Sequence, residues 1–202
     1  MLQTATVEQS TLVLLKQLQQ LPLLSDCRLV GGTALALQLG HRHSVDLDFF
    51  GQVEVDAQVV VHELEEQFDV FIENQSKRVT VFKINGVKVD VVNYPFEWLE
   101  PPIEIEGVKM AGLKDIAAMK LEAVTNRGTK KDFVDVYFLL QHFTLQQMLD
   151  LYKKKFIRGS VFNVIRSLVY FEDAEKYVMP NMLTPLKWNE VKDFIKHTVT
   201  TL

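Results

Sequence analysis

Two carboxylates, Asp46 and Asp48, lie inside an apolar run that also contains Leu47, Phe49 and Phe50. This run predicts a β-strand from Asp46 to Phe50, a place where aspartate is unfavourable. Residues i and i+2 of a strand project to the same face, so both carboxylates would point the same way, with Cα atoms roughly 6.5–7 Å apart. Convergent carboxylates bind Mg²⁺ well, and the sequence therefore predicts a metal site here.

The segment before this strand predicts a phosphate site. Gly31 and Gly32 follow a short predicted strand, 28–30, and precede a predicted helix, 33–39. Glycine permits close approach of a ligand, and main-chain N–H groups at a helix N-terminus attract phosphate. The hydroxyl of Thr33 can cap this helix or contact a phosphate oxygen.

A polar turn, residues 40–44, separates that helix from the Asp46 strand. Arg42 could pair with either carboxylate or contact a phosphate, and Ser44 could hydrogen-bond to either group. We expect His41 and His43 to lie in a solvated turn, since a zinc site would need more His or Cys residues.

Asp90 is a third carboxylate within a predicted strand, 87–92, whose valines form one apolar face. It could complete the metal site, or it could face water on a half-exposed strand. Asn85-Gly86 predicts a two-residue hairpin turn before that strand.

The order of predicted elements divides the chain into two parts. Strands are also expected at 68–73, 78–84 and within 103–110, with helices at 7–21 and from an Asp56 cap to residue 66. Helices are then expected at 113–126, 130–143, 144–156, 160–171 and 185–197. We therefore predict an α/β core over residues 1–110 and a helical domain over residues 111–202.

Two charges in the helical part lie in apolar surroundings. Lys120 falls on the apolar stripe of its predicted helix, and Asp135 lies in a helix that is apolar nearly all round. An unpaired buried charge is costly, so we predict a Lys120–Asp135 pair between helices. The pair is either a structural salt bridge or part of a cleft in which Lys120 binds phosphate. Lys131 and Asp132 have milder surroundings.

The net charge of −4 argues against a general nucleic-acid coat or a basic membrane-binding surface. Basic clusters at 114–131 and at Lys153, Lys154, Lys155 and Arg158 could still contact an RNA backbone. The single cysteine, Cys27, is expected to be a small buried side chain. With no apolar run long enough to span a bilayer and no signal-peptide pattern, we expect a cytoplasmic protein.

Two motifs together resemble a known family. Gly31-Gly32-Thr33 with His41-Arg42-x-Ser44-x-Asp46-Leu-Asp48-Phe49-Phe50 is similar to the signature of the AbiEii/AbiGii-type nucleotidyltransferases, in the DNA polymerase β-like superfamily. Ala118-Met119-Lys120 followed by Arg127-Gly-x-Lys-Lys131-Asp132-Phe-x-Asp135 resembles that family's later motif. The resemblance covers residues 28–142. This sequence departs from the superfamily in having Gly-Gly where Gly-Ser is more common. Thr33 could supply the hydroxyl that is lost with the serine.

The resemblance implies an α+β fold, with a mixed β-sheet, flanking helices and a C-terminal helical domain that completes the cleft. It implies Mg²⁺- or Mn²⁺-dependent transfer of a nucleoside monophosphate from an NTP to an acceptor such as transfer RNA, by a toxin accompanied by an antitoxin. Membrane and DNA-specific binding are not expected. Carried over by motif, the triphosphate would contact Gly31, Gly32, Thr33, Arg42, Ser44 and Lys120. Asp46, Asp48 and Asp90 would hold the metal, and Lys120 and Asp135 would complete the site.

Three alternatives stay open at this point. The chain could be a small-molecule nucleotidyltransferase of the aminoglycoside type, a nucleotide-binding regulatory module without turnover, or an interaction protein whose carboxylates are only ion-paired. Nucleotide binding measured beside nucleotide transfer separates these alternatives.

Overall fold

The computed structural model describes residues 1–53 and 56–202, and these form two compact units. Unit 1 comprises residues 1–39, 44–95 and 102–111. Unit 2 comprises residues 40–43, 96–101 and 112–202. The main break in sequence falls between Ala111 and Gly112, yet two short segments of the first half, 40–43 and 96–101, belong with the helices of unit 2.

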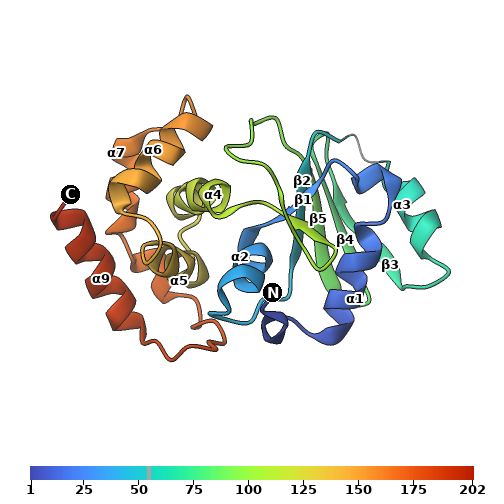
Figure 1. Cartoon of the computed structure of the whole chain (residues 1–202), viewed down its shortest axis with the longest axis horizontal. Coiled ribbons are helices and arrows are strands. Elements are labelled where there is room, and N and C mark those ends of the chain that lie inside the picture. Colours follow the sequence, from blue (N-terminus) through green and yellow to red (C-terminus); the bar gives the residue numbers. More distant parts are fainter. Residues whose placement is uncertain (54–55) are drawn as a thin grey trace. The chain divides into compact units, whose positions relative to one another are not determined.

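The described part of unit 1 is built on a mixed β-sheet (Figure 1). Its strands are β1 (Arg28–Val30), β2 (Leu47–Gly51), β3 (Val70–Gln75), β4 (Val79–Ile84), β5 (Val87–Asn93), β6 (Ile103–Ile105) and β7 (Val108–Met110). The strand order is β3-β4-β5-β2-β1-β7-β6. β2 runs parallel to β5 and β1 runs parallel to β7, while the other neighbouring pairs are antiparallel. The predicted mixed sheet is thereby confirmed.

Turn chemistry explains the β4–β5 and β6–β7 hairpins of this sheet. Asn85 and Gly86 have φ values of 49° and 81°, as the predicted two-residue turn between β4 and β5 requires. The single short strand expected within 103–110 is instead two strands, β6 and β7. Glu106 and Gly107 make the turn between them with φ values of 53° and 77°. Glutamate is uncommon in a left-handed conformation, so Glu106 does not mark this turn in the sequence.

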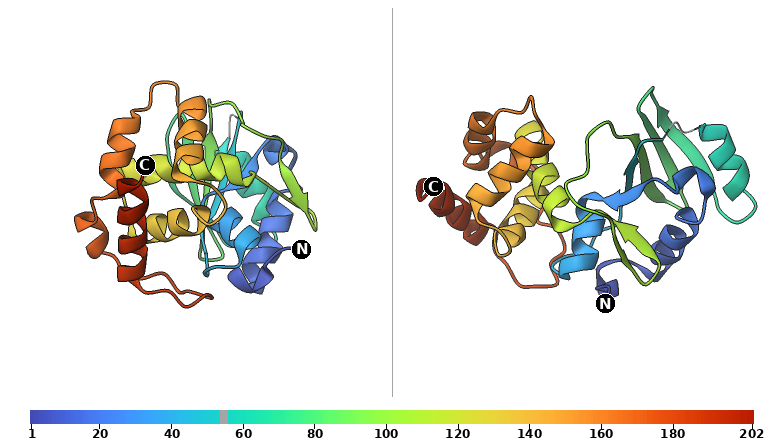
Figure 2. Two further views of the ribbon diagram at one scale, coloured as in Figure 1. Left: turned by 60° about the vertical axis from the view of Figure 1, so that its left-hand side comes forward. Right: turned by 45° about the horizontal axis from the view of Figure 1, so that its top comes forward.

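Helices cover both faces of the sheet of unit 1 (Figures 1 and 2). They are α1 (Gln9–Leu18), α2 (Gly31–Leu39) and α3 (Ala57–Leu64), with 3₁₀ turns η1 (Thr4–Thr6) and η2 (Pro22–Leu24). α2 lies on one face, and α1 and α3 lie on the other. The carboxylate of Asp56 accepts the Gln58 N–H at 3.0 Å, so the predicted cap of α3 is confirmed. α1 ends earlier than predicted, at Leu18, since the chain turns before Pro22.

Unit 2 is helical in all of its described regular elements. They are α4 (Leu113–Asn126), α5 (Lys130–Leu139), α6 (Leu145–Lys155), α7 (Val161–Leu168), α8 (Glu172–Glu175) and α9 (Trp188–Thr200). α4 packs against α5, α6 and α7, while α9 packs against α5 and α7. Apolar side chains of these helices form the core of the unit, among them the fully buried Leu121, Phe133, Met148 and Ile195. The short helix α8 was not predicted. In the described ranges, every helix is too short or too polar to cross a membrane.

Candidate active site

Three carboxylates lie along two neighbouring parallel strands of unit 1. Asp48 in β2 pairs in register with Asp90 in β5, and Asp46 immediately precedes β2. Leu47 and Phe49 are fully buried, whereas Asp48 is half-buried, so the alternation predicted for this strand is confirmed. The strand itself is Leu47–Gly51, one residue later than predicted. Because neighbouring strands are about 4.8 Å apart, the pairing brings Asp48 and Asp90 side by side.

Gly31 packs against the Asp48 carboxylate. A Cβ added at Gly31 would lie 2.3 Å from Asp48 Oδ2, a distance that real Cβ atoms do not tolerate. Gly31 is the first residue of α2 and has a φ of 69°, a left-handed conformation that favours glycine. The glycine therefore allows a carboxylate to lie at the start of a helix, where the partial positive charge of the helix stabilises it.

Thr33 joins this helix to the carboxylate strand. Its side chain is fully buried, and its hydroxyl donates a hydrogen bond to the main-chain oxygen of Asp46. The Ser44 hydroxyl lies 2.9 Å from the Thr33 hydroxyl. These contacts fix the start of β2 and the turn before it. Thr33 therefore positions Asp46 in this structure, while a direct phosphate contact by either hydroxyl stays a prediction.

Lys88 lies on the same face of the sheet as Asp90. Its ammonium is 2.6 Å from Asp90 Oδ1, and the register of β2 with β5 places it at the level of Asp46. The face therefore gathers hard oxygen ligands of the kind that Mg²⁺ prefers, together with one cation. Within residues 1–53 and 56–202, no group of three or more His, Cys, Asp or Glu side chains is already placed to hold a metal ion. Carboxylates are the donors that Mg²⁺ prefers, but Asp90 is held by Lys88 in this structure, so metal binding by Asp46, Asp48 and Asp90 stays a prediction.

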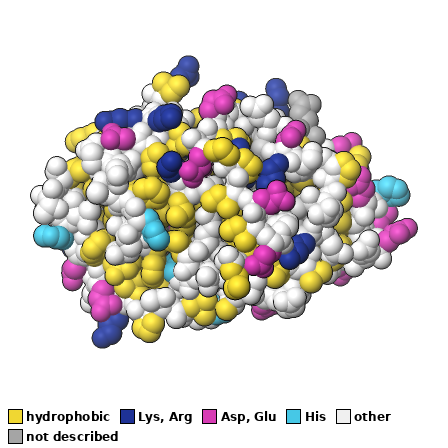
Figure 3. Space-filling view, in the orientation of Figure 1, with side chains coloured by type: hydrophobic (Ala, Val, Ile, Leu, Met, Phe, Trp, Pro, Cys, Tyr) yellow, Lys and Arg dark blue, Asp and Glu magenta, His cyan; other side chains and the backbone are white. Residues whose placement is uncertain are grey.

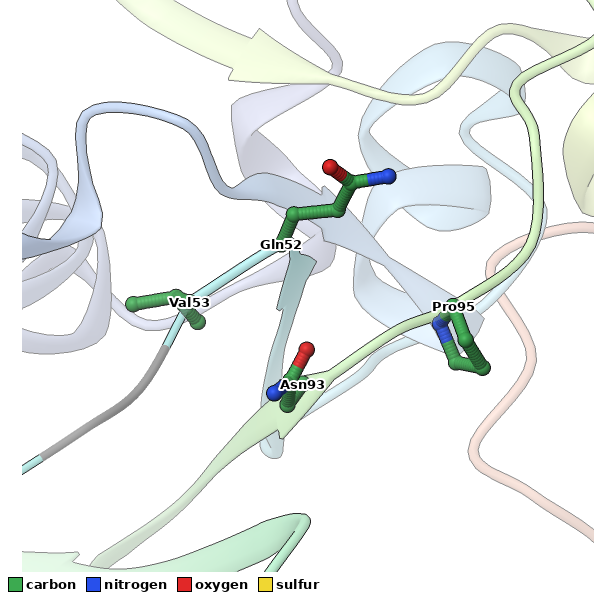
Figure 4. Close-up of a pocket in the computed structure, with 4 residues that line it drawn as sticks. All are labelled: Gln52, Val53, Asn93 and Pro95. Atoms are coloured by element: carbon green, nitrogen blue, oxygen red, sulfur yellow. The ribbon is translucent and has the colours of Figure 1, made fainter.

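A pocket opens at the carboxyl ends of the same two strands (Figure 4). Gln52, Val53, Asn93 and Pro95 line it, and its volume is about 370 Å³. Gly51 at the end of β2 pairs with Asn93 at the end of β5, so the two amide side chains come from neighbouring strand ends. The sequence alone does not point to these residues, since uncharged amide side chains are common after a strand.

Lys120 and Asp135 meet in the interior of unit 2, as predicted. Lys120 Nζ is 2.6 Å from Asp135 Oδ2, and both side chains are almost completely buried. Arg42 also binds Asp135 with two parallel hydrogen bonds, from Nε to Oδ1 at 2.7 Å and from Nη2 to Oδ2 at 2.8 Å. Burial alone would raise the pKa of Asp135, but Lys120 and Arg42 hold it well below its usual range. These contacts support a structural ion cluster, and direct phosphate binding by Lys120 or Arg42 stays a prediction.

Asp132 belongs to the same cluster, contrary to the milder surroundings that we expected for it. Its side chain is fully buried and binds Lys120 at 3.2 Å and Arg127 at 2.9 Å. The hydroxyl of Thr129, the residue before α5, also donates to it at 2.6 Å. Burial raises the pKa of Asp132, but Lys120 and Arg127 outweigh that effect and lower it. The sequence pattern missed this because Asp132 looks like an ordinary first-turn residue of a helix.

The expectation of a solvated turn is wrong for His41. Its ring is completely buried, stacks near Phe138 with centroids 4.7 Å apart, and donates from Nε2 to Asp135 at 2.9 Å. In the described part of the chain, no hydrogen-bond partner reaches its Nδ1. Burial lowers the pKa of His41, and the contact with Asp135 only partly offsets this. The buried position of His41 therefore favours the neutral form of its ring.

A second buried ion pair fixes the segment 96–101 to the helices of unit 2. The Asp115 carboxylate accepts the Leu99 N–H at 3.0 Å and binds Lys155 Nζ at 2.7 Å. Lys155 also donates to the Glu97 carbonyl and lies over the Trp98 ring, 4.7 Å from its centroid. Lys155 therefore does not belong to an exposed basic cluster, unlike Lys153 and Lys154.

Cys27 is buried, as expected for a small apolar side chain. Burial and the nearby Asp26 raise the pKa of its thiol to about 11. A thiol with a raised pKa is a poor nucleophile, which agrees with the expected structural role of Cys27.

Known proteins share the sequence pattern and the fold of this chain. A family model described as "Nucleotidyl transferase AbiEii toxin, Type IV TA system" matches residues 13–197. An uncharacterized protein of Aquifex aeolicus strain VF5 is 37% identical over 191 residues, which cover 92% of each chain.

Two solved structures share the fold. JHP933 from Helicobacter pylori has a TM-score of 0.61 and 19% identity, covering 97% of this chain and 94% of its own. MenT4, a nucleotidyltransferase toxin from Mycobacterium tuberculosis H37Rv, has a TM-score of 0.57 and 19% identity, covering 94% of this chain and 84% of its own. The architecture described above is therefore one that nucleotidyltransferases use.

Proposed function

We propose a reaction for this chain from one premise: it belongs to the AbiEii nucleotidyl transferase toxin family, and it is a nucleotidyltransferase. The reaction is Mg²⁺-dependent transfer of a nucleoside monophosphate from an NTP to a hydroxyl of RNA, with transfer RNA as the acceptor. Mn²⁺ can take the place of Mg²⁺. We place this activity in the cytoplasm and expect an antitoxin to accompany it.

The observation that carries the proposal is the in-register pair of Asp48 and Asp90, with Gly31 packed beneath Asp48. Asp46, Asp48 and Asp90 would hold the metal. When bound, Mg²⁺ would polarise the α-phosphate and stabilise the charge on the departing pyrophosphate. The glycine at position 31 brings the Asp48 carboxylate to the start of a helix, where main-chain N–H groups attract phosphate.

The bond changes follow from this placement. The acceptor hydroxyl attacks the α-phosphorus of the NTP, the bond between the α-phosphorus and the bridging oxygen breaks, and pyrophosphate leaves. The hydroxyl proton passes to Asp90 or to solvent. Main-chain N–H groups at Gly31 and Gly32 would bind the triphosphate, since the first N–H groups of a helix have no partner within it. Thr33 would keep Asp46 in place through its hydrogen bond to the main chain.

Radiolabelled NTPs, supplied one at a time with Mg²⁺ and total transfer RNA, test the reaction. We expect label in the RNA, and we expect Asp48→Asn to reduce it more than about 100-fold, because even residues that only orient metal ligands are worth 10- to 100-fold. Asp69→Asn changes an exposed carboxylate of the same unit and is the matched control. Undiminished transfer by Asp48→Asn would refute the assignment. Nucleotide binding without any transfer would favour the regulatory-module alternative.

A further inference from the structure

The charge of the chain is unevenly distributed. Residues 144–170 carry five basic side chains and a single acidic one, Asp150, although the whole chain has a net charge of −4. One of the five, Lys155, is buried against Asp115, whereas Lys153, Lys154, Arg158 and Arg166 are exposed. These four lie at the end of α6, in the connection to α7 and within α7 itself. The α6–α7 region is therefore a basic surface on an otherwise acidic protein.

Exposed apolar side chains lie among these cations. Phe162 and Tyr170 are 72% and 49% exposed, and Arg166 lies four residues from each of them, so all three project from neighbouring positions along α7 and its end. Figure 3 shows yellow and dark blue side chains next to one another in the part of unit 2 where α6 and α7 lie. Large exposed rings are costly unless something covers them.

The same face of α7 lines a pocket. Asn163, Arg166, Ser167 and Tyr170 from this region, with Thr125 at the end of α4, enclose about 300 Å³. The lining offers an amide, a guanidinium, hydroxyl groups and one aromatic ring. These groups hydrogen-bond to the edges of a base and stack on its face, which is how proteins bind unpaired RNA bases.

We propose that this surface, which we call the α6–α7 face, binds an unpaired segment of RNA. It consists of Lys153, Lys154, Arg158, Phe162, Arg166 and Tyr170. The four cations contact phosphates, and one base enters the pocket and stacks on Tyr170 or Phe162. The proposal rests on the proposed function, since it identifies the RNA acceptor as what the surface recognises. Cations alone would suit an acidic protein as well, but the exposed rings and the base-sized polar pocket favour RNA.

Fluorescence anisotropy with a labelled single-stranded RNA and with transfer RNA tests this on the full chain. The triple variant Lys153→Gln, Lys154→Gln, Arg158→Gln should raise the Kd roughly tenfold to hundredfold. It should also lower the slope of log Kd against log salt by about 2, since each phosphate contact on a single strand contributes about 0.7. Phe162→Ser should raise the Kd about fivefold or more through lost stacking.

The matched control is Lys77→Gln, Arg78→Gln, Lys83→Gln, which removes the same charge from exposed positions in unit 1. We expect it to leave RNA affinity within about twofold of the wild type. Equal losses in both triple variants, or no loss in either, would overturn the proposal. Weakened binding of polyglutamate with unchanged RNA affinity would assign the face to an acidic protein partner instead.

These measurements need neither NTP nor metal. If the α6–α7 face is wrong and the proposed function is right, RNA binding survives the triple substitution and labelled NMP still enters RNA. If the proposed function is wrong and the face is right, Asp48→Asn and the wild type bind RNA equally and neither labels it.

Discussion

At the scale of single residues, Gly31 is constrained both by its backbone conformation and by its neighbour Asp48. Its φ of 69° and the 2.3 Å distance from an added Cβ to Asp48 Oδ2 act together. Gly31→Ala should therefore move Asp48 and abolish nucleotide transfer. It should also lower the free energy of unfolding by more than the roughly 1 kcal/mol that a left-handed alanine costs. Urea unfolding and the transfer assay measure the two effects.

Gly86→Ala is the matched control, because Gly86 also has a positive φ, 81°, but nothing lies within 4 Å of an added Cβ. This substitution should lower the free energy of unfolding only by the cost of the left-handed backbone, and it should leave nucleotide transfer unchanged. Equal effects of the two substitutions would mean that the contact with Asp48 has no energetic consequence.

His41 predicts a dependence of stability on pH. Its pKa is lowered in the folded protein from an ordinary value of 6.5, so below that pH the unfolded chain binds a proton that the folded protein does not. Stability is then lost as pH falls below about 6.5, by at most about 1.4 kcal/mol for each pH unit, because a single proton is involved. Urea unfolding at about pH 7.5 and about pH 5.5 should show this loss in the wild type and a smaller one in His41→Gln.

His62→Gln is the control for this prediction, since the His62 side chain is 86% exposed. It should keep the pH dependence of the wild type. A wild-type protein equally stable at both pH values would contradict the neutral, buried state of His41.

The residue scale also shows what a single sequence can reveal. Lys120 and Asp135 were predicted as a pair because each is a charge in an apolar helix, and the pair is confirmed. His41 and Asp132 were missed because their local sequences are polar. Their burial depends on tertiary contacts, with Phe138 and Lys120 respectively, that local periodicity does not encode.

At the scale of elements, strong local signals gave accurate boundaries. β1 and α4 have the predicted limits, 28–30 and 113–126, since glycines mark their ends and their apolar residues recur regularly. α5 ends four residues earlier than predicted, at Leu139, because the apolar pattern continues through the turn after it. The β6–β7 hairpin was missed because its turn uses Glu106.

The Asp115 carboxylate is one of the groups that hold segment 96–101 against the helices of unit 2. Asp115→Asn removes the charge that pairs with buried Lys155, and breaking such a pair costs about 3–5 kcal/mol. We expect lower stability and faster amide hydrogen exchange, at Leu99 above all, because its N–H donates to Asp115. Hydrogen exchange followed by mass spectrometry measures this.

Asp173→Asn is the comparison, since Asp173 pairs with Lys176 on the exposed surface. It should leave both stability and exchange in 96–101 unchanged. Exchange in that segment that stays slow in Asp115→Asn would show that the remaining contacts hold it without the carboxylate.

At the scale of the whole molecule, the predicted single boundary near residue 110 does not describe how the chain is divided. Segments 40–43 and 96–101 are counted with unit 2. A hydrophobicity pattern identifies elements one after another and contains no information about which of them later pack together. Tertiary contacts reveal the assignment of segment 40–43, through His41 and Arg42 with Asp135. Those of Asp115 with Leu99 and Lys155 do the same for segment 96–101.

This division predicts the behaviour of fragments. Residues 112–202 alone would lack Arg42 and His41, so Asp135 would be buried with only Lys120 to pair with it. We expect this fragment to unfold without a cooperative transition when followed by circular dichroism in urea. Adding a fragment of residues 1–111 to the same sample should restore a cooperative transition. A fragment that unfolds as cooperatively as the full chain would contradict the prediction.

The interleaved chain has a consequence for inheritance. Between residues 39 and 112 the polypeptide passes from one unit to the other five times. A recombination event with a single breakpoint cannot exchange one unit for that of a distant relative without also separating Arg42 from Asp135. An exchange of one whole unit would need a breakpoint at each of the five crossings.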